Sequence, residues 1–93
     1  MIKTFKDDLT QSIYQRQISR KLPPDIQQIA LRKLRMINNA ISLNDLRVPP
    51  ANRLEKLTGN RTGQWSIRIN DQWRICFEWQ ESDAYNVQIV DYH

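Results

Sequence analysis

The spacing of the apolar residues changes near the middle of the chain, and this change constrains the fold more than any other feature. Between Ile26 and Ile41 apolar residues recur every three or four positions, which is the repeat of an amphipathic helix. From Gln64 onward they alternate with polar residues, which is the repeat of a strand with one covered face. A helical first half and a second half of consecutive strands predict an α+β fold.

Two helices are expected before residue 42. Asp7 and Asp8 offer N-cap oxygens to a first helix, which ends near Arg20 and carries Leu9, Ile13 and Ile18 on its apolar face. A second helix begins at the Pro23-Pro24 pair, because proline is tolerated in a first helical turn. Its apolar face comprises Ile26, Ile29, Ala30, Leu34, Ile37 and Ile41, and its other faces carry Gln27, Arg32, Lys33 and Arg35.

The remaining segments read as strands and connections. A short strand is expected at residues 1–5, and an irregular connection with room for one helical turn at 42–52. Further strands are expected at 53–57, 64–70, 73–79 and 84–90, with turns between them. The prediction is a single domain spanning residues 1–93, in which two helices pack on one face of an antiparallel sheet of about four to five strands and leave the other face open.

Strand alternation sorts the side chains of this sheet. The covered face takes Trp65, Ile67, Ile69, Trp73, Ile75, Phe77 and Trp79, and Tyr85, Val87 and Ile89 share one side of the last strand. The opposite face takes Arg68, Arg74, Cys76 and Glu78. Arginine forks bind phosphate oxygens in a bidentate way, so Arg68 and Arg74 mark a candidate phosphate-binding surface, which Arg53, Lys56 and Arg61 extend.

Charge is concentrated in the middle of the chain. Residues 16–74 hold 12 Lys and Arg against four Asp and Glu, whereas the remainder holds two Lys against six acids. A polyanion such as a nucleic acid is favoured as partner of the central region, although a solvated basic surface gives the same count.

The composition argues against disulfide-linked, zinc-binding, cofactor-binding and membrane proteins. Cys76 and His93 are the single Cys and the single His, so neither an internal disulfide nor a structural zinc site is expected, and no motif suggests a cofactor. The chain contains no apolar stretch of about 18 residues and does not start with a signal-peptide pattern, so a cytoplasmic protein with no membrane association is expected.

The C-terminus carries the second candidate site. Asp91-Tyr92-His93 places a carboxylate, a phenol and an imidazole side by side. RNA cleavage without a metal requires a base for the ribose 2′-hydroxyl, an acid for the leaving 5′-oxygen and a cation for the phosphorane, and His can perform either proton transfer.

Three segments then form a specific pattern. They read Leu57-x-Gly59-x-Arg61-x-Gly63-x-Trp65-Ser66-Ile67-Arg68-Ile69-Asn70, Gln72-Trp73-Arg74-Ile75-Cys76-Phe77 and Val90-Asp91-Tyr92-His93. In these segments, in its opening MIKTFKD and in its length, the chain resembles HigB toxins of the RelE/ParE superfamily. The resemblance covers nearly the whole chain and is densest from Asn52 to His93.

This resemblance implies a RelE-like fold and a metal-independent endoribonuclease that cleaves mRNA on the translating ribosome. It implies that Arg74 stabilises the phosphorane, that Asp91 and His93 handle protons, and that Tyr92 orients or stacks on a base. Arg53, Lys56, Arg61, Arg68 and Asn70 are expected to bind RNA. The implied partners are the ribosome, mRNA, a HigA-type helix-turn-helix antitoxin, and operator DNA reached only through the antitoxin complex.

Two features leave alternatives open. Some members carry His and Lys where Glu55 and Thr58 stand here, so Glu55 is a possible alternative general base. Strict alternation would place Asp91 and His93 on the face opposite Arg74 unless a bulge or the end of the strand intervenes.

Two other functions compete with the ribonuclease. A gyrase inhibitor of the ParE type on the same fold is the runner-up function, and a non-toxic nucleic-acid-binding module is a third.

Overall fold

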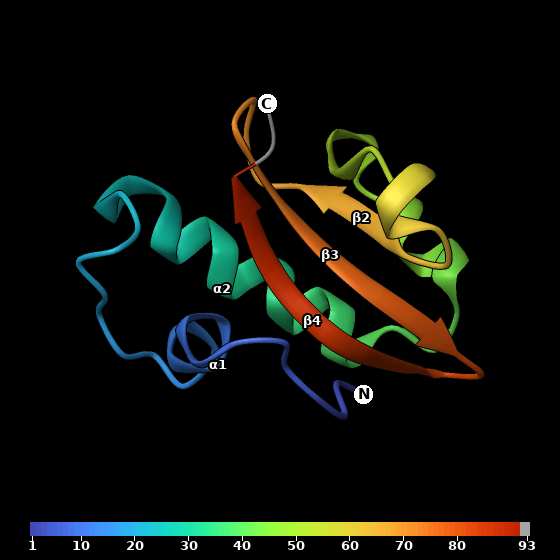
Figure 1. Ribbon diagram of the computed structural model, residues 1–93, viewed down its shortest axis with the longest axis horizontal. Coiled ribbons are helices and arrows are strands. Elements are labelled where there is room, and N and C mark those ends of the chain that lie inside the picture. Colours follow the sequence, from blue (N-terminus) through green and yellow to red (C-terminus); the bar gives the residue numbers. More distant parts are fainter. Residues whose placement is uncertain (92–93) are drawn as a thin grey trace.

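In the computed structural model, which describes residues 1–91, two α-helices precede an antiparallel sheet of four strands (Figure 1). The helices are α1 (Asp8–Tyr14) and α2 (Pro24–Asn39), followed by the short 3-10 helices η1 (Leu43–Arg47) and η2 (Pro50–Asn52). The strands are β1 (Glu55–Lys56), β2 (Trp65–Arg68), β3 (Trp73–Gln80) and β4 (Asp83–Asp91), and η3 (Gly59–Arg61) links β1 to β2. Each strand pairs with the next in sequence, which confirms the α+β prediction.

The N-terminal segment lies along the outer edge of β4. Two isolated parallel bridges, Ile2 to Ala84 and Phe5 to Val87, replace the continuous strand that the sequence predicts. The Lys3 N–H donates to the Ala84 carbonyl at 2.8 Å and the Lys6 N–H to the Val87 carbonyl at 2.9 Å. The segment therefore satisfies the backbone groups of an edge strand that would otherwise be unpaired.

Both helices are shorter than the apolar spacing predicts. Asp7 caps α1 by accepting the Thr10 N–H, but the helix ends at Tyr14 because Arg16 adopts a left-handed conformation with φ of 65°. Ile18, predicted on the core face of this helix, lies in the connection that follows and is 93% exposed. Beyond α2 the extended residue Ala40 ends the helical repeat, and Ile41 is 75% exposed rather than buried. No helix within residues 1–91 has both the length and the apolar character needed to cross a membrane.

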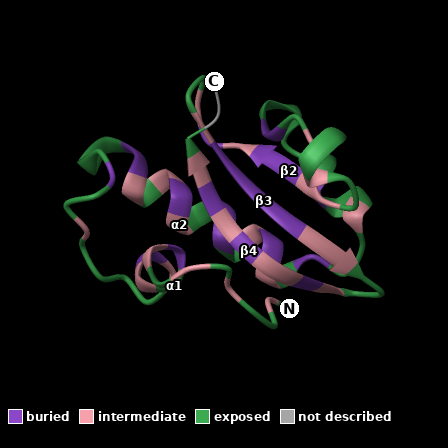
Figure 2. Ribbon diagram, in the orientation of Figure 1, coloured by how far each residue is buried: buried purple, intermediate pink, exposed green. Residues whose placement is uncertain are grey.

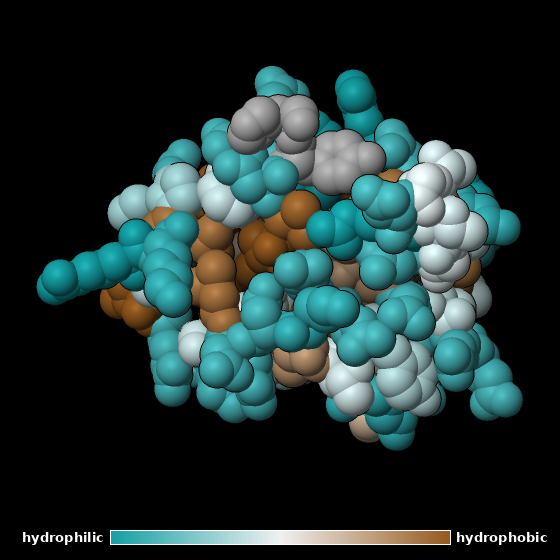
Figure 3. Space-filling model, viewed as in Figure 1, coloured by the Kyte–Doolittle hydropathy of each residue, from teal (hydrophilic) through white to brown (hydrophobic). Residues whose placement is uncertain are grey.

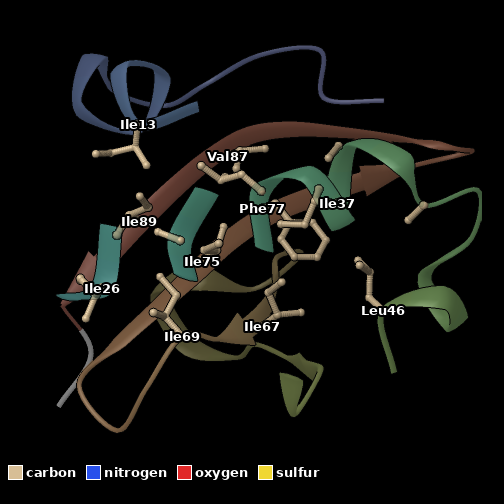
Figure 4. Packing of buried hydrophobic residues seen from close by; sticks show 14 of the residues in the cluster. Ile13, Ile26, Ile37, Leu46, Ile67, Ile69, Ile75, Phe77, Val87 and Ile89 are labelled. Atoms are coloured by element: carbon tan, nitrogen blue, oxygen red, sulfur yellow. The ribbon is translucent and has the colours of Figure 1, made fainter. Parts of the chain in front are cut away.

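The core lies between α2 and the face of the sheet that carries Ile67, Ile75 and Phe77, which we call the helix face. α1 contacts both α2 and β4 and adds Ile13 to this core (Figure 4). Residues 74–77 of β3 are all buried (Figure 2). Trp65, Trp73 and Trp79 are partly buried against the same cluster, so the aromatic residues are core rather than a base-stacking platform.

A bulge in β4 changes which residues share a face. Cys76 pairs with Gln88, but Glu78 pairs with Tyr85, so β4 contains one more residue than β3 in this interval. Asn86, with φ of 53°, occupies the interval. The sequence prediction that Tyr85 shares a face with Val87 is therefore wrong: Ala84 is buried with Val87, and Tyr85 lies opposite Glu78 on the other face.

A second departure from the helical repeat is a buried lysine. Lys33, predicted on an outer face of α2, is only 4% exposed, and its ammonium donates to the side-chain oxygen of Asn52. The Asn52 amide, itself fully buried, donates to the Leu46 carbonyl at 3.1 Å and the Val48 carbonyl at 3.4 Å. Burial lowers the pKa of Lys33, and the positive charges of Arg32 and Arg68 lower it further. The pair joins α2 to the irregular connection that leads into the sheet.

This network predicts a specific loss of stability. Asn52→Ala removes the acceptor of a buried ammonium and the donor to the buried Leu46 carbonyl and the partly buried Val48 carbonyl, which should lower the free energy of unfolding by about 2–4 kcal/mol. Urea denaturation measures the change. Asn44→Ala, at an exposed position of η1, is the matched control and should change stability by less than about 0.5 kcal/mol. Equal effects of the two substitutions would contradict this account.

Candidate functional site

Arg74 is the best-defined polar side chain of the sheet, because three oxygen-bearing groups hold its guanidinium. Its Nε donates to Ser66 Oγ at 2.8 Å, and an Nη donates to the Arg53 carbonyl at 2.8 Å. The same Nη lies 3.9 Å from a carboxylate oxygen of Glu55. The side chain of Arg74 is 9% exposed, whereas that of Glu55 is 54% exposed. The guanidinium is thus fixed in position, and its carboxylate partner stands at the surface.

The pairing register places these groups on one side of the sheet. Glu55 pairs with Ser66, Ser66 with Cys76, and Arg68 with Arg74. Side chains of directly opposed residues point to the same side, so all five share the face opposite the helix face, which we call the arginine face. Its centre is not open as the sequence predicts, because Ser66, Arg74 and Cys76 are buried. Alternation did, however, group Arg68 with Arg74 correctly.

The hairpin between β2 and β3 positions Arg68 and Asn70. Arg68 forms an ion pair with Asp71, and this interaction lowers the pKa of the Asp71 carboxyl. The Asn70 side-chain oxygen accepts the N–H groups of Gln72 and Trp73 at 2.9 and 2.8 Å, which shapes the turn. In this structure Asn70 therefore supports the loop that presents Arg68, at one end of the arginine face.

The other predicted phosphate-binding residues lie in different surroundings. Arg53 contributes its carbonyl to Arg74 from a left-handed conformation with φ of 44°. Arg61, on η3, donates to the Gln64 side chain at 3.1 Å. Burial raises the pKa of the Cys76 thiol, and the positive charges of Arg61 and Arg74 oppose that rise. Lys56 instead sits 5.9 Å from the centre of the Trp65 ring and shares the side of that residue, away from Arg74.

The C-terminal residues are only partly described. Asp91 pairs with Trp73 in the register, while Arg74 pairs with Val90. Asp91 therefore projects from the side opposite Arg74, because the bulge at Asn86 lies too early in β4 to change the alternation there. Its carboxylate accepts from the Gln72 side chain at 3.2 Å. Tyr92 and His93 lie outside the described residues.

The structure brings Arg74, Arg68 and Glu55 together and adds two groups that the sequence predictions missed. Ser66 and the Arg53 carbonyl orient the guanidinium, since each accepts one of its N–H groups. Alternation placed Ser66 on the face of Arg74, and that signal could have identified it. A backbone carbonyl leaves no such signal in a sequence. Within residues 1–91 no three His, Cys, Asp or Glu side chains gather so as to hold a metal ion.

Comparison with known proteins identifies the family of this chain. The family model of the HigB-like toxin, a RelE-like toxin of type II toxin–antitoxin systems, matches residues 3–93. The Vibrio cholerae protein named Toxin HigB-1 is 38% identical over 90 residues, which cover 96% of this chain and 95% of that protein. The Proteus vulgaris protein named Endoribonuclease HigB is 33% identical over 94 residues and covers both chains in full.

A solved structure supports the fold. In the YoeB–YefM complex from Staphylococcus aureus, one chain is similar to this protein with a TM-score of 0.60 and 18% identity, covering 100% of this chain and 98% of that chain. At this identity the similarity establishes the shared fold alone. The family match and the two relatives span nearly the whole sequence. The chain therefore belongs to the HigB-like family of RelE-like toxins from type II toxin–antitoxin systems.

Proposed function

We propose that this toxin is a metal-independent endoribonuclease that cleaves mRNA on translating ribosomes and thereby inhibits growth. The name Endoribonuclease HigB of the relative from Proteus vulgaris supports the reaction class. The observation that carries the proposal is the fixed, nearly buried guanidinium of Arg74 on the arginine face, with Arg68 as its neighbour across the β2–β3 pair. Translating ribosomes are in the cytoplasm, which is the proposed site of action.

Arg74 would supply the electrostatic part of catalysis. A charged fork held rigidly before the substrate arrives can stabilise the developing charge of a phosphorane without reorganising. Glu55 neutralises the guanidinium at 3.9 Å in the free protein, and its exposure allows a phosphate oxygen to replace it at the surface. Arg68, Arg61 and Arg53 would add positive charge along the RNA backbone, and Asn70 would act beside Arg68 at one end of this surface. Lys56 shares the opposite side with Trp65, so it would reach RNA only around the edge strand β1.

Proton transfer is assigned to the C-terminal groups. His93 would transfer a proton to or from the ribose or the leaving oxygen, Asp91 would assist it and Tyr92 would orient a base of the RNA. Because Asp91 projects from the side opposite Arg74, the chain has to turn after Asp91 for His93 to reach the phosphate held by Arg74. Glu55, already beside Arg74, is the alternative base.

The family also implies an inhibitor. A type II toxin is held inactive by a cognate protein antitoxin, so we propose a HigA-type helix-turn-helix antitoxin as the partner, and operator DNA bound only by that complex. The solved complex of YoeB with YefM supports a protein partner for this fold.

Replacing Arg74 tests the electrostatic role. Arg74→Lys keeps a charge but loses the planar fork, so we expect mRNA cleavage to slow by roughly ten- to a hundredfold, and Arg74→Ala by about 10²- to 10³-fold. Cleavage of a reporter mRNA in a reconstituted translation reaction gives the rates, and thermal unfolding confirms that the variants fold. Arg47→Lys, at an exposed position of η1, is the matched control. Unchanged cleavage by Arg74→Ala would refute the assignment, and blocked DNA supercoiling with intact mRNA would favour gyrase as the target.

Comparing variants of His93, which bears an imidazole, and Glu55, which bears a carboxylate, identifies the general base. Deleting His93 should slow cleavage by about 10²- to 10⁴-fold and remove the limb of the pH–rate profile near neutrality. Glu55→Gln should slow cleavage much less. Single-turnover rates between pH 5 and 9 measure both effects. A larger loss for Glu55→Gln, with the neutral limb retained after His93 is deleted, would move the base assignment to Glu55.

A further inference from the structure

A groove of about 450 Å³ lies between α2 and the connection that joins it to α1, and none of the residues that line it belongs to the arginine face. Its lining combines three apolar residues (Ile13, Ile18 and Leu31), three arginines (Arg16, Arg32 and Arg35) and three glutamines. In Figure 1 this connection projects from the end of the molecule beside α2, and in Figure 3 apolar and hydrophilic atoms lie side by side at that end. The groove belongs to the helix side of the sheet, whereas Arg74 faces the other side.

The connection is anchored so that it presents an apolar side chain to solvent. The Gln27 side chain of α2 accepts the Ser19 N–H at 3.2 Å and donates to the carbonyls of Ser19 at 2.6 Å and Leu22 at 2.9 Å. On the other side of Ile18, the Gln17 N–H donates to the Ser12 carbonyl at 2.9 Å. Leu22 is buried while Ile18 stays 93% exposed. Hydrogen bonds thus hold the backbone on both sides of Ile18. Its side chain lies beside the apolar residues of the groove but is itself exposed to solvent.

The charge around the groove has a single sign. The ion pairs among residues 1–91 join Met1 to Asp83, Arg68 to Asp71 and Arg74 to Glu55, so none of the three groove arginines is paired with a carboxylate of the described chain. No acidic residue lines the groove. Three unpaired cations around an apolar floor complement a partner that carries carboxylates and at least one large apolar side chain.

We propose that this groove docks the antitoxin, through an acidic segment that inserts an apolar side chain against Ile18 and Leu31. The inference rests on the antitoxin partner of the proposed function. A protein segment fits better than RNA, because a phosphate backbone would satisfy the arginines but would leave Ile18 in water, whereas an apolar side chain buries it. Since the groove and Arg74 lie on different sides of the sheet, antitoxin binding and RNA cleavage are separable by substitution.

The test uses the full chain and the antitoxin that copurifies with it when both are expressed from their own operon. The toxin variants are Ile18→Asp and the pair Arg32→Glu with Arg35→Glu, and the matched controls are Ile41→Asp and Arg47→Glu, which are exposed but outside the groove. Calorimetric titration of each refolded toxin with antitoxin at several salt concentrations gives Kd. Thermal unfolding confirms that each variant folds, and ribosome-dependent mRNA cleavage without antitoxin is measured in parallel.

We expect each groove variant to weaken antitoxin binding by roughly tenfold or more, the arginine pair to reduce its salt dependence, and both to cleave mRNA as the unsubstituted chain does. Equal Kd values for groove and control variants would overturn the docking proposal while leaving the nuclease intact. Normal antitoxin binding with impaired cleavage by the arginine pair would assign the groove to ribosomal RNA instead. Failure of the unsubstituted chain to cleave mRNA would refute the proposed function separately from the docking site.

Discussion

The side chain of Arg74 is the interaction on which the functional half of the molecule depends. It leaves β3, bonds Ser66 on β2, and reaches the carbonyl of Arg53 just before β1. Through these two bonds one guanidinium joins three consecutive segments of the sheet on the face opposite α2. β1 has only two residues, so its ladder bonds alone hold it weakly, and the link through Arg74 ties it to the rest of the sheet. The residue proposed to stabilise the phosphorane thus also organises its structural surroundings.

Strand alternation explains how the rest of the protein is divided. The helix face takes the core, including Ile67, Ile75 and Phe77, and the arginine face takes the polar groups that approach one another across β1, β2 and β3. The bulge at Asn86 shifts the alternation within β4, so that Ala84 and Val87 both reach the core although they are three positions apart. Beyond the bulge the side chains of β4 again alternate in register with those of β3. Asp91, which pairs with Trp73, consequently lies on the side away from Arg74.

The sequence predicted the order of the elements and the shared face of Arg68 and Arg74, because both depend on local periodicity. It did not predict the early end of α1, which depends on the left-handed conformation of Arg16, nor the bulge at Asn86, since these are single-residue backbone events. Lys33 was assigned to a solvent face because a lysine in a helical repeat normally lies there; its burial depends on Asn52, 19 residues away in sequence. The Arg53 carbonyl that anchors Arg74 was missed for a similar reason, because a backbone acceptor is defined by the fold and not by residue type.

Two buried cations illustrate how charge type is matched to position. Lys33, on α2, donates to a neutral amide oxygen, and burial lowers the pKa of this titratable cation. Arg74 is not titratable, since a guanidinium stays protonated in proteins, so its near-burial requires oxygen acceptors and a carboxylate close by. An arginine at position 33 would bring a permanent charge into a site with one amide acceptor, and a lysine at position 74 would lose the fork that bonds Ser66 and Arg53 together. The permanent cation therefore lies beside a half-exposed carboxylate at the proposed RNA-binding face, and the titratable one lies in the network that joins α2 to the connection before the sheet.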